Sequence, residues 1–398
     1  MSPLETFRRD TRAWLGENCP QSMRGRMVPG EEINGGSKRR STNPDAYLWL
    51  ERMASRGWTV PTWPVEYGGG GLDKAHFLVL LEELQRLGAR PPLGGMGVTM
   101  LGPTLLEYGS ESQKLEHLPK IASGEVAWCQ GYSEPGAGSD LASLATRAED
   151  RGDHFLVNGS KIWTSGAQHA DWIFCLVRTD PAAPKHQGIS FLLFSMDSPG
   201  VSVKPIDMLN GRSPFCQTFF DDVKVPKHDL VGERNQGWTV AKRLLQHERS
   251  GLAALASADR AGPLERIQPT RTLADLAKFY DGGTIADPAL RADLVDNEMH
   301  KHAFLLTRRR AVEEAEASTP GAATSIFNYV EAEFVKAQLE LQMQIRGSRA
   351  LGWDGAGFDD EEVAMTRLWL EAKSISIAGG SNEVQLNIIA KRVLGLPD

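Results

Sequence analysis

Apolar residues near the start of the chain follow a helical spacing. Leu80, Leu84 and Leu87 recur at steps of four and three, which places them on one face of an α-helix. The same spacing returns after Gly237 and persists toward the C-terminal end. The helices expected in that later part cover residues 240–255, 290–317, 323–344, 361–374 and 382–394. The pattern therefore predicts one helical segment in each half of the chain. The second segment is expected to form a helix bundle.

Between these two parts the pattern changes to short β-rich runs separated by turn residues. The runs occupy residues 155–157, 161–163, 172–177, 189–194, 201–205 and 217–225. Their number and spacing are typical of a small sandwich or barrel. Asn158-Gly159 separates the first two runs, and an Asn-Gly pair suits the positive φ angles of a two-residue type I′ turn. We therefore expect a hairpin at these residues.

The order helix, β, helix predicts an α+β multidomain protein. The expected parts are an N-terminal helical domain at residues 1–125, a middle β-barrel or β-sandwich domain at residues 126–236, and a C-terminal four-helix bundle at residues 237–398. The last helix has clear limits, because Gly379 and Gly380 interrupt the chain before it and Ser381 is a suitable N-cap.

Composition excludes several classes of protein. A chain of 398 residues, 41% hydrophobic and 24% charged, is ordinary globular material with enough apolar side chains for two or three cores. Lys plus Arg at 44 against Asp plus Glu at 51 gives a formal net charge of −7, which disfavours a partner made of nucleic acid. No run approaches the roughly 18 apolar residues of a membrane span.

Cysteine usage and the N-terminal segment indicate the compartment. The four cysteines are widely spaced, without a C-x-x-C pair, which argues against a disulfide framework and a zinc site. The histidines form no paired metal-ligand spacing either, so we expect no metal. Charged residues in the opening turns lack the pattern of a secretory signal. We expect a reducing, cytoplasmic location.

The first candidate for chemistry is the loop at residues 132–140. Gly136 and Gly138 would let its backbone approach a ligand closely, and the hydroxyls of Ser133 and Ser139 would bond a polar edge. The loop is not a dinucleotide fingerprint, since no G-x-G-x-x-G opens a helix after a strand. A Gly- and Ser-rich connection is also often an ordinary turn.

The second candidate is the tripeptide that begins at Trp163. In a strand, Trp163 and Ser165 lie on the same side, and a large flat indole beside a hydroxyl would suit a flat heteroaromatic ring. The alternative is a tryptophan buried in the core.

Taken in chain order, these segments make the sequence resemble the flavin-dependent acyl-CoA dehydrogenases. The matching pieces are residues 58–71, 131–140, 158–166, 221–226, 344–347 and 379–395, together with Gly232 and Gly237. The resemblance implies a three-domain subunit that binds FAD between the β-domain and the bundle, with the adenine end reaching a neighbouring subunit.

The resemblance also assigns roles to individual residues. It implies that a first group binds the cofactor, namely Tyr132, Ser133, Trp163, Ser165, Gln344, Gly347, Ser381 and Glu383. It implies that a second group, Ser139, Arg249 and Gly379, contacts the acyl-CoA; for Arg249 the alternatives are orientation of the neighbouring Glu248 and a structural ion pair. In this second group, the backbone N–H of Gly379 would help to hold the thioester oxygen.

The reaction implied by the resemblance needs a base. A proton leaves the carbon α to the thioester while hydride leaves the β carbon for flavin N5, so a carboxylate shielded from water is required. Many members carry it in a Tyr-Glu-Gly sequence before the last helix, where this chain has Ala378-Gly379-Gly380. Other members keep it on the first bundle helix, immediately before an arginine. The match is Glu248, which precedes Arg249; by pattern alone such a Glu lies on a solvated surface.

The chain departs from the family where a subunit lends cofactor contacts to its neighbour. The usual Arg, Phe-Gly and Gln spacing is absent from residues 264–282, and Gln344 begins the sequence Gln-Ile-Arg-Gly-Ser. We therefore expect either a homo-oligomer or an α2β2 assembly with a related subunit, as in the heteromeric dehydrogenases of steroid side-chain breakdown. The expected partners are a bulky or steroid side-chain acyl-CoA and an electron-transferring flavoprotein. The alternatives are a non-catalytic assembly or binding subunit, an acyl-CoA oxidase, and a desulfinase.

Overall fold

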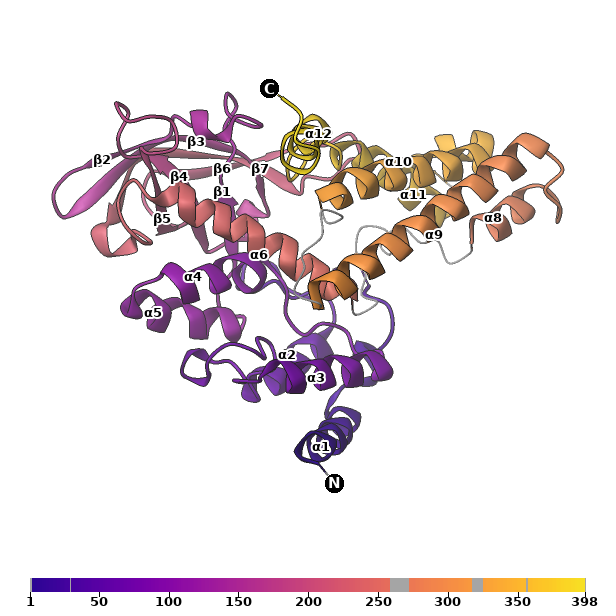
Figure 1. Cartoon of the computed structure of the whole chain (residues 1–398), viewed down its shortest axis with the longest axis horizontal. Helices are drawn as coiled ribbons and strands as arrows, with labels where there is room; N and C mark the ends of the chain where they lie inside the picture. The colour runs from indigo at the N-terminus through magenta and orange to yellow at the C-terminus, as the bar shows by residue number, and fades with distance from the viewer. Residues whose placement is uncertain (1, 29, 258–271, 317–324, 356, 398) are drawn as a thin grey trace. The chain divides into compact units, whose positions relative to one another are not determined.

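The computed structural model describes residues 2–28, 30–257, 272–316, 325–355 and 357–397; within these, the side chains of residues 248–257, 312, 315 and 316 are not described. The chain forms two compact units. The first comprises Met1–Ile206 and Ser213–Ala253, and the second comprises Asp207–Arg212 and Ala254–Asp398. Figure 1 shows the helices and strands of both units.

The first unit opens with helices that pack on tryptophans. These helices are α1 (Pro3–Asn18), α2 (Pro44–Ser55), α3 (Lys74–Leu87), α4 (Gly102–Tyr108) and α5 (Glu111–Ala122). Trp49, Trp58 and Leu80 are buried in the core of α1 to α3. Glu83 of α3 is also buried, and Arg12 of α1 donates to its carboxylate at 2.8 and 2.9 Å. These charge-assisted bonds lower the pKa of Glu83 to about 2 and hold α1 on α3.

The β part of the first unit is one curled sheet. In the described chain it has seven strands: β1 (Trp128–Gly131), β2 (Arg147–Asp150), β3 (His154–Ser165), β4 (Trp172–Arg178), β5 (Ile189–Ser195), β6 (Val201–Ile206) and β7 (Phe215–Pro226). Their order is β1-β4-β2-β3-β7-β6, and β5 pairs with β4. The long β3 and β7 are antiparallel. The predicted runs at 172–177, 189–194, 201–205 and 217–225 therefore coincide with strands.

Both faces of the central strands are buried, which explains their uninterrupted apolar sequences. On β4, Ile173 and Cys175 belong to a core inside the curled sheet. Phe174 and Leu176, which alternate with them, belong to a second core. That second core also contains residues of α4, α5 and α6 (Gly237–Ser257), for example the fully buried Leu244. The N-terminal half of α6 is thus packed on the sheet within the first unit.

The hairpin predicted at Asn158-Gly159 is wrong. Residues 154–165 form the single strand β3, and its pairing with β7 shifts register at Val157/Gly159. Gly159 has φ +147°, and a Cβ there would lie 2.6 Å from the Thr146 side chain. The Asn158 amide bonds Asp222 on β7 at 2.9 Å. Asn158 therefore lies opposite a bulge in β7, where Asp221 and Asp222 together face this one residue, and Gly159 is required by the close approach of Thr146.

The second unit is helical. Its helices are α8 (Leu273–Tyr280), α9 (Pro288–Glu316), α10 (Phe327–Arg346), α11 (Asp360–Glu371) and α12 (Asn382–Ile388). Figure 1 shows α9 and α11 running beside α10, and both contact it. Phe304 of α9, Leu339 of α10 and Met365 of α11 share one core. The helical spacing of the sequence predicted α9 to α12, but it did not predict α8.

Other properties of the described residues bear on the sequence analysis. No helix within them is both long and apolar enough to cross a membrane. All four cysteines are free and buried. Burial raises the pKa of Cys175 to about 12, so this thiol stays protonated near neutral pH.

Candidate functional site

The loop that follows β1 has a defined shape. Gly131 ends β1, Tyr132 after it is buried, and Ser133 is half-buried. The backbone N–H of Glu134 donates to the carbonyl of Ala137 and the reverse bond also forms, both at 3.0 Å. These two hydrogen bonds close a tight turn. Ser133, the residue before the turn, is therefore held at a fixed distance from the sheet.

Strand β3 brings an exposed tryptophan beside this loop. Trp163 has φ +62° and is 51% exposed, at a register shift that rotates its side chain away from the sheet interior. The neighbouring Ile162 N–H donates to the Ser133 carbonyl at 2.8 Å. Phe215, the β7 partner of half-buried Ser165, meets the Trp163 ring edge-to-face at 6.0 Å. The structure thus places Ser133 beside the end of β3 that carries Trp163 and Ser165.

A buried ion pair supports this arrangement. Lys161 of β3 is 0% exposed, and its ammonium lies 2.8 Å from the carboxylate of buried Glu134 and donates to the Tyr132 carbonyl at 3.1 Å. The same carboxylate accepts backbone N–H bonds from Ala145 at 2.6 Å and Thr146 at 2.9 Å. Burial raises the pKa of Glu134, but the charge and hydrogen bonds of these partners outweigh it and hold that pKa below its ordinary value.

Sequence reasoning missed this pair. A signal was present, because side chains two apart on a strand share a face, and Phe155, Val157 and Lys161 lie at odd positions of β3. The first two are fully buried in the sheet interior. A lysine in phase with them is therefore expected to face inward, where it needs an anionic partner.

A second cation shapes the chain just beyond the loop. Arg178 donates to the Ala142 carbonyl at 2.6 Å and to the Lys185 carbonyl at 2.7 Å. Lys185 in turn forms an ion pair with Asp140 at 2.7 Å. The residue before Asp140 is Ser139, which is exposed. Ser139 therefore lies on a surface turn whose ends are held by charged groups.

The residues predicted to act as base and substrate contact fall on α6. Glu248 and Arg249 occupy consecutive positions within this helix. Their side chains lie outside the described residues. Their roles stay predictions.

Near the end of the second unit, Ser381 caps α12. Its hydroxyl accepts from the Val384 N–H at 3.4 Å. Hydrogen bonds from its own backbone and from Ser381 lower the pKa of exposed Glu383. Gly379 has φ +69°, and a Cβ built on it would meet no atom within 4 Å. A small residue with left-handed backbone therefore precedes the helix, next to open space.

The remaining predicted cofactor residues lie elsewhere in the second unit. Gln344 is exposed near the end of α10, and Gly347 follows with φ +54°. The start of α12 is tied to α10 at Glu333, which bonds the Asn382 amide at 2.5 Å. Eleven residues of helix, about 16 Å, separate Glu333 from Gln344. The structure therefore does not bring the Gln344 pair and the Ser381 pair together.

Unused hydrogen-bonding capacity is concentrated beside Gln344. Gln342 is fully buried, and Arg346 is 4% exposed. Among the described residues, the amide atoms of Gln342 and the Nε and Nη1 atoms of Arg346 have no hydrogen-bond partner. Such groups are rare in protein interiors, so this end of α10 is incomplete within the described chain.

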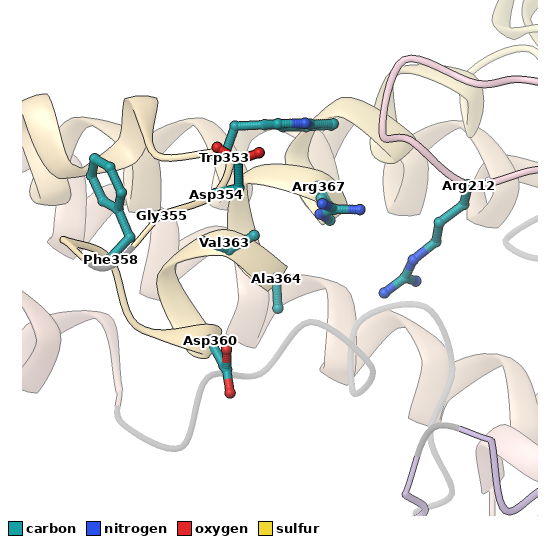
Figure 2. Close-up of a pocket in the computed structure, with 9 residues that line it drawn as sticks. All are labelled: Arg212, Trp353, Asp354, Gly355, Phe358, Asp360, Val363, Ala364 and Arg367. Atoms are coloured by element: carbon teal, nitrogen blue, oxygen red, sulfur yellow. The ribbon is translucent and has the colours of Figure 1, made fainter.

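The second unit contains a cavity of about 460 Å³, and Figure 2 shows the side chains that line it. Arg367 stacks on Trp353 with its guanidinium carbon 4.5 Å from the ring centroid. Arg212 also lines the cavity, as do Asp354 and Asp360. The two cations are balanced by two carboxylates, which gives the cavity no preference for an anion. No residue predicted for the site lines this cavity, and we assign it no ligand.

Comparison with known proteins identifies the family. Three acyl-CoA dehydrogenase models match the chain: the N-terminal domain at residues 30–125, the middle domain at residues 129–223 and the C-terminal domain at residues 235–394. The chain belongs to the acyl-CoA dehydrogenase family. It is therefore an oxidoreductase, and the predicted α+β fold, helical at both ends with a β-domain between, is confirmed. Members of the family are flavoproteins that use FAD.

Full-length relatives support the same assignment. The acyl-CoA dehydrogenase IpdE1 of Mycolicibacterium smegmatis is 36% identical over 410 residues, with 100% of this chain and 99% of the relative covered. The structure "Tcur3481-Tcur3483 steroid ACAD" matches with 32% identity and a TM-score of 0.75, covering 100% of this acyl-CoA dehydrogenase and 99% of that chain. The ChsE4-ChsE5 complex from Mycobacterium tuberculosis matches with 28% identity and a TM-score of 0.70, at 100% and 99% coverage.

Proposed function

We propose that this acyl-CoA dehydrogenase converts an acyl-CoA thioester to the 2,3-enoyl-CoA by FAD-dependent α,β-dehydrogenation. The observation that carries the proposal is the cluster of Ser133, Trp163 and Ser165 at one end of β3. Its half-exposed indole and flanking hydroxyls fit a flat, polar-edged ring system. When bound, FAD supplies the acceptor for the hydride that leaves the β carbon.

The described residues suit particular parts of that cofactor. Trp163 would cover a face of the ring, while the hydroxyls of Ser133 and Ser165 would bond its polar edge. Tyr132 would stay in the wall behind them, because it is buried. The other residues proposed to bind the cofactor lie in the second unit: Gln344, Gly347, Ser381 and Glu383. Beside Gln344, the unpartnered atoms of Arg346 and Gln342 indicate that further groups are needed to complete the site.

In this proposal Glu248 removes the proton from the carbon α to the thioester. Negative charge then builds on the thioester oxygen, and the backbone N–H of Gly379 donates to that oxygen. Arg249 contacts the substrate or orients Glu248. Ser139, on its exposed turn, contacts the CoA part of the substrate.

A bulky acyl group is the proposed substrate class, with a steroid side-chain thioester as the specific candidate. The open space beside Gly379 supports a bulky substrate, since glycine there has no side chain where many family members carry a glutamate. The similarity to a structure described as a steroid ACAD supports it as well. We propose an electron-transferring flavoprotein as the acceptor that reoxidises the enzyme.

Anaerobic titration with acyl-CoAs of graded size tests the activity and the substrate class together. The yellow holoenzyme is expected to lose its visible flavin absorbance when the bound cofactor is reduced, most completely with the bulkiest thioester. Bleaching only by short, unbranched acyl-CoAs would contradict the substrate class. A yellow protein that no acyl-CoA bleaches would indicate a non-catalytic subunit, and peroxide release in air would indicate an oxidase.

The proposed assembly is an α2β2 complex with a related subunit. Exposed apolar side chains on α9, such as Val295 at 55% and Met299 at 65%, support an oligomer. Similarity to the ChsE4-ChsE5 complex supports a heteromeric one. The chain expressed alone is expected to bind less than one FAD per subunit, and co-expression with its partner to restore binding. A homo-oligomer with one FAD per chain, measured by absorbance and light scattering, would overturn this assembly.

A further inference from the structure

A cluster of charged side chains joins α4 to α6. Glu107 near the end of α4 accepts two hydrogen bonds from Arg243 of α6, from Nε and Nη2, both at 2.7 Å. The same carboxylate lies 3.1 Å from Nε2 of His247. The contact with His247 does not have the geometry of a hydrogen bond, so Arg243 is the α6 residue that Glu107 holds, while His247 lies beside the same carboxylate.

The two α6 positions next to Glu107 share one face of the helix. Arg243 and His247 are four residues apart, so they lie on nearly the same face of the helix. Glu248 follows His247 directly in the helix. Further from Glu248, buried Val240 and Leu244 pack on the core of the first unit. Of the α6 side chains that are described, His247 is the last before Glu248.

The α4 end of the contact is well fixed. Leu101 and Leu105 are 0% exposed. Gly102 packs so closely on Trp63 that a Cβ would lie 2.0 Å from the indole. Glu107 therefore projects from a helix that has little freedom to shift.

We propose that Glu107 is a positioning residue: through its two hydrogen bonds to Arg243 it sets the rotation of α6 and so the placement of Glu248, five residues further along the helix. This inference rests on the proposed function, in which Glu248 is the base. The side chains of Glu107 and Arg243 are 36% and 42% exposed, and ion pairs of that kind add little to stability. A base displaced by about 1 Å, in contrast, loses about 10²-fold in rate.

The test compares Glu107→Gln with Lys242→Met in the purified, flavin-loaded assembly. Lys242 is exposed on α6 beside Arg243, so its replacement changes helix charge without touching the cluster. For Glu107→Gln we expect the limiting rate of flavin reduction to fall by about 10- to 100-fold. The acyl-CoA dissociation constant, FAD content and melting temperature should stay at wild-type values. Lys242→Met should match the wild type in every measurement.

A charge swap provides the rescue. Glu107→Arg combined with Arg243→Glu restores an ion pair between the same helices and should recover part of the lost rate. An unchanged rate in Glu107→Gln would overturn the inference, as would a slower rate accompanied by lost FAD or a lower melting temperature. Glu248→Gln separates this failure from that of the proposed function. If Glu248→Gln stays active, the assignment of Glu248 as the base is wrong. If Glu248→Gln is inactive but Glu107→Gln reacts at the wild-type rate, only the role proposed for Glu107 is wrong.

Discussion

Glu248→Gln is expected to keep FAD bound and to slow anaerobic flavin reduction by acyl-CoA by about 10²- to 10⁴-fold, the usual contribution of general base catalysis. Glutamine has nearly the shape of glutamate but accepts no proton at neutral pH. Substrate binding should therefore change little, so the loss should appear in the limiting rate and not in the dissociation constant. Stopped-flow absorbance with the bulkiest reactive thioester measures both quantities.

Two further variants make the Glu248 result specific. Glu248→Asp keeps a carboxylate on a shorter side chain and is expected to lie between the wild type and Glu248→Gln. Glu298→Gln makes the same chemical change at a side chain that is 59% exposed on α9, and it should leave the rate unaltered. Exchange of the substrate α proton with heavy water should stop with Glu248→Gln. Reduction at the wild-type rate in that variant would assign the base to another residue.

Lys161→Met is expected to destabilise the first unit by about 3–5 kcal/mol, which is typical when one partner of a buried ion pair is removed. The variant leaves the Glu134 carboxylate, 9% exposed, without its cation, and it removes the donor to the Tyr132 carbonyl. Because Tyr132 and Glu134 flank Ser133, FAD content should fall as well. Urea unfolding followed by tryptophan fluorescence, together with FAD absorbance, measures the two effects.

Lys185→Met is the matched control. Lys185 pairs with Asp140 at 2.7 Å, but these side chains are 59% and 62% exposed. Loss of such a surface pair is expected to change stability by less than about 1 kcal/mol. A double variant, Lys161→Met with Glu134→Met, should recover part of the loss, since no unpaired buried charge remains. Equal stability of Lys161→Met and the control would show that the buried pair does not hold the loop.

The same pair makes stability depend on pH. The folded-state pKa of Glu134 lies below its ordinary value of 4.5. Its contribution is therefore complete above that value and is lost as the pH falls toward the folded-state pKa. Below about pH 4.5 the wild type should lose stability with a steeper slope than the double variant.

The sequence predicted elements whose signals are local. The uninterrupted apolar runs of β4 and β5 and the helical spacing of α9 to α12 are such signals, because each reflects burial of a single segment. Where structure depends on a distant partner, the prediction failed. Asn158-Gly159 looked like a turn because the contacts that compete with a turn, those with Thr146 and Asp222, come from distant parts of the chain.

The candidate site was predictable to a similar extent. One candidate cluster, that of Ser133, Trp163 and Ser165, was suggested by the residue types and by the resemblance to a family. The left-handed backbone that turns Trp163 outward was not readable, since it arises from a register shift against β7. The Lys161 and Glu134 pair was not found either, because its two halves are far apart in sequence and meet only after β3 forms.

The backbone of Trp163 imposes a compromise between durability and activity. A non-glycine residue in the left-handed region is strained by about 1–3 kcal/mol, and the indole also keeps apolar surface in water. Glycine there would relax the chain but would remove the aromatic face. The apoprotein is therefore less stable than the same fold would be with an unstrained residue at this position. Binding of a ligand on the Trp163 ring would then increase its stability.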